Sequence, residues 1–221
     1  MQAVILAAGK GARLRPITHT IPKPLIDVAG KPLIEHVLEA LPGNVNELFI
    51  IVNHLREQII EHLGKSWNKI SIQYVIQEPL SGTAGALWLL RNQLQDRFLV
   101  VNSDDLYEHE DLERLVEQDR AMLVFKVDRL LGAGAQTDES GRFVRLGPGS
   151  LAVCGAYVLD QTIFKIDPVE IKVSKYREFG LPQTLELLVQ ANTIQTVQAT
   201  QWQPVGTHEQ LKAAKTLTCR E

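Results

Sequence analysis

The 221-residue sequence is poor in cysteine, with only Cys154 and Cys219, and neither has the spacing of a metal site or a disulfide framework. It also lacks a long hydrophobic run, because no stretch approaches the ~20 apolar residues of a membrane span. The short apolar stretch near the N-terminus has no basic segment before it, as a secretory signal would have. We therefore expect a cytoplasmic protein with no membrane partner.

An excess of positive charge is absent as well. The formal net charge is -3, whereas a nucleic-acid-binding surface concentrates Lys and Arg over a whole face. No nucleic-acid partner is therefore expected. With 45% hydrophobic residues the chain can bury one substantial core, so residues 1–221 are expected to form a single domain.

Two common phosphate-binding motifs are missing. No G-K-[ST] sequence occurs, which excludes a Walker loop. After Gly9 and Gly11, the position of the third glycine of a dinucleotide fingerprint is occupied by Leu14. What is present is a continuous apolar run from Val4 to Ala8, typical of a buried parallel strand, which breaks at Gly9 into a long loop with prolines.

This loop is rich in cations. Residues 1–31 hold five Lys or Arg and one acid, a local excess of +4 in a chain of net charge -3. Glycines let the backbone approach a ligand closely, and the fork of an arginine fits phosphate oxygens. The pattern predicts a phosphate-binding loop, and the alternative is a proline-rich surface loop with incidental lysines. Its cations are Lys10, Arg13, Arg15, Lys23 and Lys31.

Apolar strands and helical patterns alternate along the following chain, and Pro32 is suited to the first turn of a helix. This alternation predicts an α/β fold with a doubly wound, Rossmann-like, mostly parallel sheet, whose ligands lie at the carboxyl ends of the strands. Strands are expected at 47–52, 70–76, 98–101, 121–127 and 151–159, weaker antiparallel strands at 135–137 and 143–146, and helices at 33–41, 55–63, 82–94 and 106–120.

Two polar motifs follow predicted strands. In Q-E-P-L-S-G-T-A-G-A-L, residues 77–87, the amide of Gln77 can both donate and accept, as reading a nucleobase edge requires. A Gly-Thr helix cap without a ligand is the alternative. In V-V-N-S-D-D-L, residues 100–106, Asp104 and Asp105 are well placed to hold a divalent cation such as Mg²⁺. A turn or a helix cap is the alternative for this pair.

The motifs together resemble a known family. L-A-A-G-K-G-A-R-L-R-P, then P-K-P-L, then V-A-G-K-P-L-I-E-H-V-L are similar to the signature of the sugar-1-phosphate nucleotidyltransferases, the nucleotide-sugar pyrophosphorylases. The resemblance implies a sheet of the nucleotide-diphospho-sugar transferase type. It divides the chain into a nucleotide-binding half at about 1–130 and a sugar-side half at about 131–221. It also implies Mg²⁺ as cofactor, and a nucleoside triphosphate and a sugar 1-phosphate as substrates.

The resemblance assigns roles to individual residues. Arg13 and Lys23 would contact phosphates as catalytic residues, and Asp104 would hold the metal, with Asp105 as the alternative. The strand C-G-A-Y and the segment R-E-F-G-L-P-Q-T-L-E-L-L would place Gly155 and Glu178 beside the sugar, although a solvated acid is the alternative for Glu178. The implied nucleotide-binding residues are Leu6, Ala8, Gly9, Gly11, Gln77, Gly82 and Thr83.

The chain departs from the family at two places. L-G-P-G, residues 146–149, stands where many members have Glu-Lys-Pro, whose lysine meets the sugar phosphate. Lys172, Lys175 or Arg145 are the candidates to replace that lysine. W-Q-P-V-G-T stands where members have W-x-D-x-G-T, so Pro204, which has no ligating side chain, occupies the position of a second metal aspartate.

Two functions follow. The first is Mg²⁺-dependent nucleotidyl transfer from a nucleoside triphosphate to a sugar 1-phosphate or a similar phosphorylated alcohol, giving a nucleotide-sugar and pyrophosphate. The second, favoured by Pro204 and L-G-P-G, is a catalytically weak or inactive homologue that binds a nucleotide or nucleotide-sugar as a sensor or partner subunit. A homo-oligomer is compatible with both.

Overall fold

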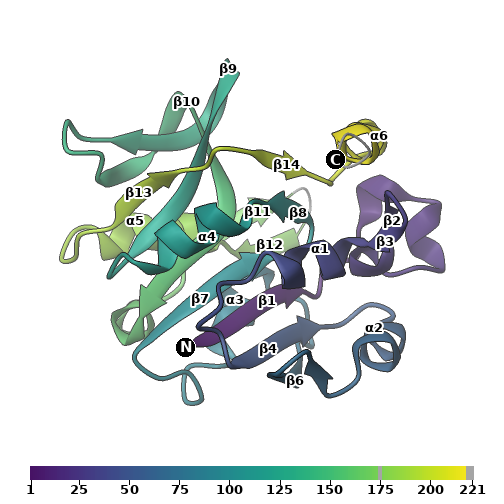
Figure 1. Ribbon diagram of the computed structural model, residues 1–221. Helices are drawn as coiled ribbons and strands as arrows, with labels where there is room; N and C mark the ends of the chain where they lie inside the picture. The colour runs from purple at the N-terminus through teal and green to yellow at the C-terminus, as the bar shows by residue number, and fades with distance from the viewer. Residues whose placement is uncertain (174–175, 218–221) are drawn as a thin grey trace.

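One eight-stranded sheet runs through the molecule in the computed structural model, which describes residues 1–173 and 176–217 (Figure 1). The strand order is β13-β9-β10-β7-β1-β4-β6-β5. The strands are β1 (Gln2–Ala7), β4 (Glu47–Val52), β5 (Ser66–Trp67), β6 (Ile70–Ile76), β7 (Arg97–Asn102), β9 (Ala121–Thr137), β10 (Phe143–Asp160) and β13 (Gln195–Gln198).

Four strands at the centre, β6, β4, β1 and β7, are parallel, with Ile5 paired to Ile50 on one side and to Val101 on the other. All three side chains are fully buried, because both faces of the sheet are covered and only apolar residues tolerate that position. The predicted mostly parallel sheet is confirmed. The sheet is nevertheless mixed, since β10 runs antiparallel to β7 and β9.

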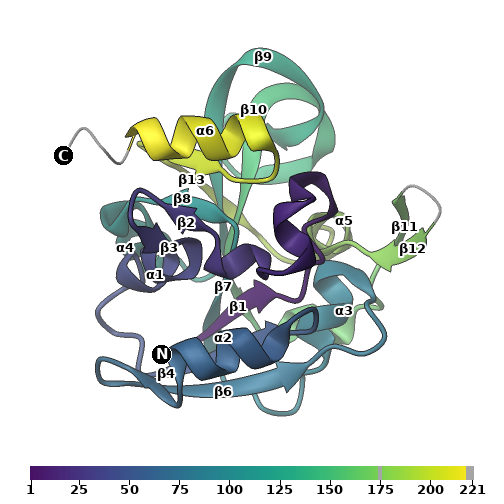
Figure 2. The same cartoon turned by 90° about the vertical axis from the view of Figure 1, so that its right-hand side faces the viewer.

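Helices cover both faces of the sheet. Along β1, Ala3 and Ile5 pack with α1 (Leu33–Glu39), α2 (Arg56–Leu63) and α4 (His109–Val116), while Val4 packs with α3 (Gly82–Trp88) and α5 (Leu181–Leu188). Alternate side chains of one strand thus enter two separate apolar cores, as the doubly wound prediction requires. A third core lies under α6 (His208–Leu217), which Figure 2 shows lying across the segment that carries β2 (Asp27–Val28) and β3 (Lys31–Pro32).

Short elements complete the fold around the ends of the strands. The chain after β1 forms the 3-10 turns η1 (Ala12–Leu14), η2 (Ile17–His19) and η3 (Lys23–Leu25), and η4 (Gln161–Lys165) follows β10. Besides the antiparallel pair of β2 with β3, two more small antiparallel pairs lie outside the main sheet among the described residues. They are β8 (Asp105–Tyr107) with β14 (Trp202–Pro204), and β11 (Glu170–Val173) with β12 (Tyr176–Phe179).

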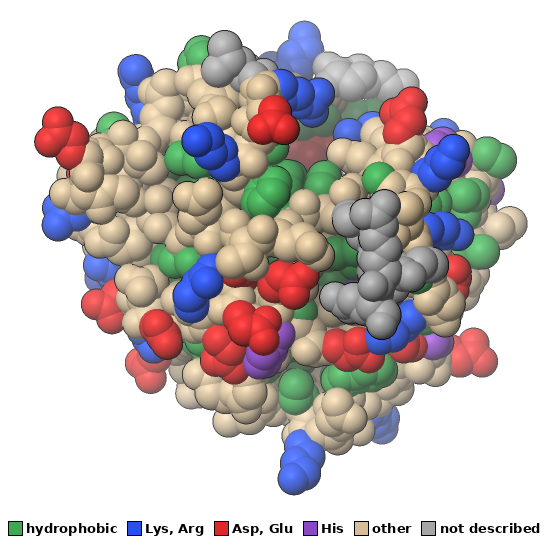
Figure 3. Space-filling view, turned by 45° about the horizontal axis from the view of Figure 1, so that its top comes forward, with side chains coloured by type: hydrophobic (Ala, Val, Ile, Leu, Met, Phe, Trp, Pro, Cys, Tyr) green, Lys and Arg blue, Asp and Glu red, His purple; other side chains and the backbone are tan. Residues whose placement is uncertain are grey.

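Two helix predictions are wrong in their bounds. The helix expected over 106–120 begins at His109 and ends at Val116, because residues 105–107 pair with β14 and bury Tyr107. The helix expected over 82–94 ends at Trp88 and continues as turns. No helix among the described residues is long and apolar enough to cross a membrane. On the face shown in Figure 3, positive and negative side chains are interspersed.

Candidate functional site

A cavity of about 310 Å³, the site pocket, opens where the carboxyl ends of β1 and β7 meet β10, β12 and the start of α3. It brings together four residues that the sequence analysis assigned separately, Leu6 and Thr83 for the nucleotide and Gly155 and Glu178 for the sugar. The lining residues are Leu6, Thr83, Asn102, Val153, Gly155, Tyr157, Ile171, Glu178, Phe179, Gly180, Pro182 and Gln183.

The phosphate loop, residues 9–25, is held in shape by a glycine turn and by hydrogen bonds from side chains to its backbone. Gly11 has φ +59°, and a Cβ there would lie 2.7 Å from Thr18 Cγ2, so only glycine fits. The Thr18 hydroxyl donates to the Gly11 carbonyl oxygen at 2.9 Å, and a ring nitrogen of His54 lies 2.9 Å from the Thr18 carbonyl oxygen. Ala8 is buried beneath the loop, whereas Gly9 and Arg13 are exposed. The loop therefore presents Arg13 to solvent from a fixed backbone.

Lys23 and Asp104 form an ion pair between the loop and the end of β7. The side chain of Lys23 is only 9% exposed and that of Asp104 is 33% exposed. Two groups that the resemblance assigned to phosphate and metal, 81 residues apart in the sequence, thus lie in contact. In the free protein each neutralises the other.

Asp105 has a different environment from its neighbour. Its Oδ2 accepts a hydrogen bond from Asn102 Nδ2 at 3.2 Å and lies 3.3 Å from the Tyr107 hydroxyl, which in turn donates to the Cys154 carbonyl oxygen at 3.0 Å. Burial, with a contribution from the charge of Asp104, raises the pKa of the Asp105 carboxyl well above its usual range. Asp104 is the more accessible of the two carboxylates and therefore the better candidate ligand for an ion.

Gly155 lets β10 pass close to this network. Its φ is +71°, and a Cβ would lie 2.0 Å from Asn102 Nδ2 and 3.1 Å from Asp105 Oδ2. The pairing of β9 with β10 shifts register between Val153 and Tyr157, as a bulge at this position requires. Burial raises the pKa of the Tyr157 hydroxyl, so this side chain lines the pocket as a neutral phenol.

The segment from Gln77 to Thr83 packs against β12, which lies in the half of the chain expected to bind the sugar. Gln77 is only 3% exposed, and its Nε2 donates to Ser81 Oγ at 3.1 Å and to the Gly82 carbonyl oxygen at 2.9 Å. Gly82 has φ +82°, and a Cβ there would lie 2.5 Å from the Phe179 carbonyl oxygen. Because the amide nitrogen of Gln77 is already engaged, the expected contact with a base would have to use its Oε1.

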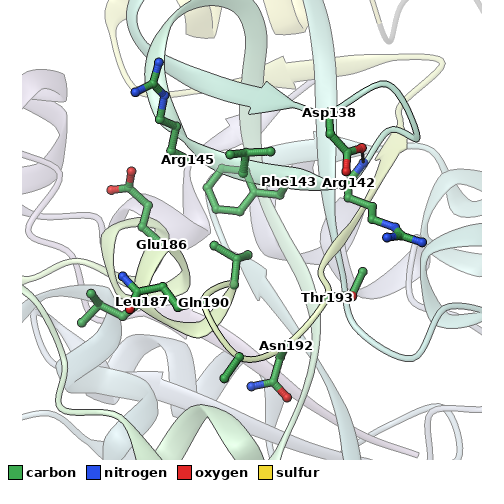
Figure 4. A pocket seen from close by; sticks show the side chains of 12 residues that line it. Asp138, Arg142, Phe143, Arg145, Glu186, Leu187, Gln190, Asn192 and Thr193 are labelled. Carbon is green, nitrogen blue, oxygen red and sulfur yellow. Dashed lines mark hydrogen bonds between the residues drawn. The ribbon is translucent and has the colours of Figure 1, made fainter.

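The lysine expected to meet the sugar phosphate has no replacement among the described residues that line the site pocket. No Lys or Arg lines it among the described residues. Lys172 is exposed on β11, and Lys175 lies outside the described residues. Arg145 Nε donates to Gln136 Oε1 at 2.6 Å, and Arg145 lines a second, larger cavity of about 780 Å³ between β10 and the chain after α5 (Figure 4). That cavity contains none of the residues assigned to nucleotide, metal or sugar.

Pro204, at the sequence position of the family's second metal aspartate, lies beside the two aspartates of this chain. It pairs with Asp105 between β14 and β8, and the Val205 N–H donates to the Asp104 carbonyl oxygen at 2.9 Å. No group of three or more His, Cys, Asp or Glu side chains that could hold a metal occurs in the described part of the chain. The residues present fit an ion held by one carboxylate together with oxygens of a substrate.

Sequence reasoning missed Asn102, Gln183 and Phe179, which all line the site pocket. A signal existed for Asn102, since it is the first polar residue after a buried strand and precedes the two aspartates. Phe179 and Gln183 stand in the segment R-E-F-G-L-P-Q-T-L-E-L-L that was quoted for Glu178, but only the tertiary fold shows that β12 and the first turn of α5 reach the end of β1.

Comparison with known proteins decides the family. Residues 2–129 match the family described as Nucleotidyl transferase. The chain belongs to this family. The predicted resemblance to the nucleotidyltransferases is thereby confirmed, and the two departures, at residues 146–149 and at Pro204, lie beyond the matched residues.

Individual relatives extend the match beyond residue 129. A protein called "Bifunctional protein GlmU" from Methanocaldococcus jannaschii is 31% identical over 93% of this chain, and the chain spans about half of that relative, 51%. The "UTP--glucose-1-phosphate uridylyltransferase AglF" of Haloferax volcanii is 28% identical, with 91% of this chain and 89% of the relative covered. A Bacillus anthracis structure, described as a glucose-1-phosphate thymidylyltransferase in complex with a sucrose, has a TM-score of 0.83 and 25% identity, covering 98% of this chain and 94% of that one.

Proposed function

We propose that this protein transfers a nucleotidyl group from a nucleoside triphosphate to a sugar 1-phosphate or a similar phosphorylated alcohol, releasing pyrophosphate. The observation that carries the proposal is the site pocket, where Thr83 of the base motif and Glu178 of the sugar motif face one cavity. The Lys23–Asp104 pair lies at the same end of the sheet, at the carboxyl end of β7. Residues up to about 130 would bind the nucleotide and the following residues the sugar, in agreement with the range of the family match.

The chemistry needs no side-chain nucleophile. A phosphate oxygen of the sugar 1-phosphate attacks the α-phosphorus, the new P–O bond forms, and the bond to the bridging oxygen breaks, so that pyrophosphate leaves with the electron pair. The protein contributes alignment and stabilisation of charge on the phosphates. Arg13, exposed on a fixed loop, and Lys23, beside the end of β7, are the cations placed for this.

Mg²⁺ is part of the proposal. Asp104 would hold it, because this carboxylate is partly exposed and Asp105 is buried. The ion supplies neutralisation of phosphate charge when it is bound. Asp104 Oδ2 is paired with Lys23 in the free protein, so an ion held by Asp104 would compete with the lysine for this carboxylate, and a released lysine would be available to a phosphate.

A second function is favoured by two specific observations, Pro204 opposite Asp105 and a site pocket without a lysine or arginine among the described residues. A chain of this kind could bind a nucleotide or nucleotide-sugar without turning it over, as a sensor or partner subunit.

Pyrophosphate release separates the two functions. The protein is incubated with Mg²⁺ and each combination of the common triphosphates with a panel of sugar 1-phosphates, and an Asp104→Asn variant serves as the control. Release from at least one combination, lost in the variant, supports the transferase. Saturable nucleotide binding without release from any combination would establish the binding protein instead.

A further inference from the structure

The guanidinium of Arg13 lies directly over Gly206. A Cβ built on Gly206 would be 2.8 Å from Arg13 Nη2 and 3.4 Å from Arg13 Cζ. The φ of Gly206 is not positive, so its backbone conformation does not require glycine. The space that a side chain would fill is occupied instead by the arginine proposed to meet the phosphates.

The two residues that follow Arg13 are held by the same C-terminal segment, residues 205–211. Leu14 is fully buried and packs in the third apolar core with Val205 and Leu211. A ring nitrogen of His208 lies 2.9 Å from the Arg15 carbonyl oxygen. The phosphate loop therefore rests on the start of α6, and Figure 2 shows this helix beside the N-terminal turns.

Gly206 is itself fixed in place. Its N–H donates to Gln210 Oε1 at 2.9 Å, and Thr207 Oγ1 accepts from the Gln210 N–H at 3.2 Å, which satisfies a free donor in the first turn of α6. The floor beneath the guanidinium is therefore a rigid helix start.

We propose that Gly206 is a positioning residue that sets the place of the Arg13 guanidinium in the phosphate site. The inference deepens the proposed function and rests on it. The proposal gives two positions of the W-Q-P-V-G-T segment different roles. Pro204 has no side chain that could bind a metal, whereas Gly206 has a task that needs no metal. The task is to leave room for the arginine.

Gly206→Ala tests the proposal with little risk to the fold. The added methyl group meets the flexible end of Arg13 and Gln210 Oε1, at 3.1 Å, so the side chains shift and the backbone does not have to move. We expect the melting temperature to stay unchanged and kcat/KM for pyrophosphate release to fall between about tenfold and a hundredfold, as displacement of a charged group by about 1 Å can cost. Gly43→Ala is the matched control, since its N–H also bonds a side-chain oxygen and its Cβ would meet only Glu113 Oε1, at 3.7 Å.

A double-mutant cycle distinguishes positioning from a structural role. In an Arg13→Ala background, Gly206→Ala should cost nothing further, because the group that it displaces is gone. Equal losses in both backgrounds, or a Gly206→Ala variant as active as Gly43→Ala, would overturn the proposal. So would an Arg13→Ala variant with normal turnover.

The same cycle, measured by calorimetric binding of inorganic tripolyphosphate, does not depend on turnover. We expect each single substitution to weaken tripolyphosphate binding and the double variant to bind no more weakly than Arg13→Ala alone; additive losses would again overturn the role of Gly206. A wild-type protein that binds tripolyphosphate but releases no pyrophosphate from any substrate pair would refute the proposed transferase and leave the test of Gly206 intact.

Discussion

The two sides of the site differ in how they are built. The nucleotide side is a loop of 3-10 turns with an exposed arginine and a buried lysine, and it falls inside the family match at residues 2–129. The sugar side is a pocket wall of uncharged side chains with a single carboxylate, Glu178, among the described residues. Under the proposed function, the loop would meet the phosphate charge, while the pocket wall would contact the shape and hydroxyl groups of the sugar.

Two cations of the loop, Lys23 and Arg13, also differ in their ion pairing in the free protein. Lys23 and Asp104 neutralise each other, whereas Arg13 takes part in no ion pair among the described residues. Under the proposed function, Arg13 could meet a phosphate without first leaving an ion pair, whereas Lys23 would have to be drawn from Asp104, for example by a cation that binds this carboxylate. The two cations of the loop should consequently differ in their dependence on metal.

The largest expected effect is that of Arg13→Ala. Loss of one preorganised charged donor to a developing negative charge costs about 10²- to 10³-fold in turnover, and the exposed side chain contributes little to the core. We expect that loss in kcat/KM with an unchanged melting temperature. Arg91→Ala, an exposed arginine at the end of α3, is the control. A lowered melting temperature would make Arg13 a structural residue, and unchanged turnover would remove it from the site.

Asp104→Asn is expected to have the next largest effect, on metal binding. If Asp104 is the one carboxylate available, Mg²⁺ is held mainly by substrate phosphates and water, so it should bind weakly to the free protein and at least about tenfold more tightly with a triphosphate. Calorimetric titration of Mg²⁺ with and without nucleotide should show this difference in the wild type and its loss in Asp104→Asn. Pro204→Asp should tighten binding. Tight binding to the free protein, or binding indifferent to Asp104→Asn, would place the metal elsewhere.

Gln77→Ala should alter base choice rather than overall affinity. The Gln77 amide is buried, and a buried polar group that a wrong base leaves unpaired costs about 1 to 3 kcal/mol. Kd values for the common triphosphates should therefore become more similar in the variant. Ser81→Ala removes one hydrogen bond of Gln77 Nε2 and keeps Oε1, so it should preserve the preference. A preference that survives Gln77→Ala would mean that the base is read by other residues.

The fold was predictable from the sequence where local patterns are strong. The apolar runs at Val4 and at 47–52 can only be buried strands in a chain that alternates with helices, and the structure has them there. The start of β8 was not predictable, because Asp105–Tyr107 becomes a strand through pairing with Trp202–Pro204, almost a hundred residues later. Local preference for a helix is overridden there by a tertiary contact.

The site shows the same limit. Leu6, Thr83, Gly155 and Glu178 were each assigned through a motif, and the fold brings them to one cavity. The motifs did not predict which of these segments touch each other. The Lys23–Asp104 pair and the hydrogen bonding of residues 77–83 to β12 are set by the three-dimensional fold. The Ser81 carbonyl oxygen, for example, accepts from the Phe179 N–H at 2.8 Å.

The smallest expected effect concerns Thr83. The resemblance assigns this residue to the nucleotide, but its side chain is hydrogen-bonded to the chain that follows the sugar motif residue Glu178. Its Oγ1 accepts from the Leu181 N–H at 2.9 Å, and this donor lies in the first turn of α5, where helix N–H groups lack partners within the helix. Thr83→Val keeps the shape and leaves that donor unpaired, at a cost of about 1 kcal/mol, whereas Thr83→Ser keeps the acceptor.

Because Leu181 follows directly after the pocket residues Glu178, Phe179 and Gly180, we expect Thr83→Val to raise KM for the sugar phosphate about fivefold and to leave KM for the triphosphate nearly unchanged. Thr83→Ser should behave as the wild type in both constants. If Thr83→Val raises only the KM for the triphosphate, Thr83 belongs to the nucleotide side and its bond to Leu181 is incidental. If both KM values rise together, residues 77–83 and residues 178–181 respond as one unit. The start of α3 would then belong to both sides of the site.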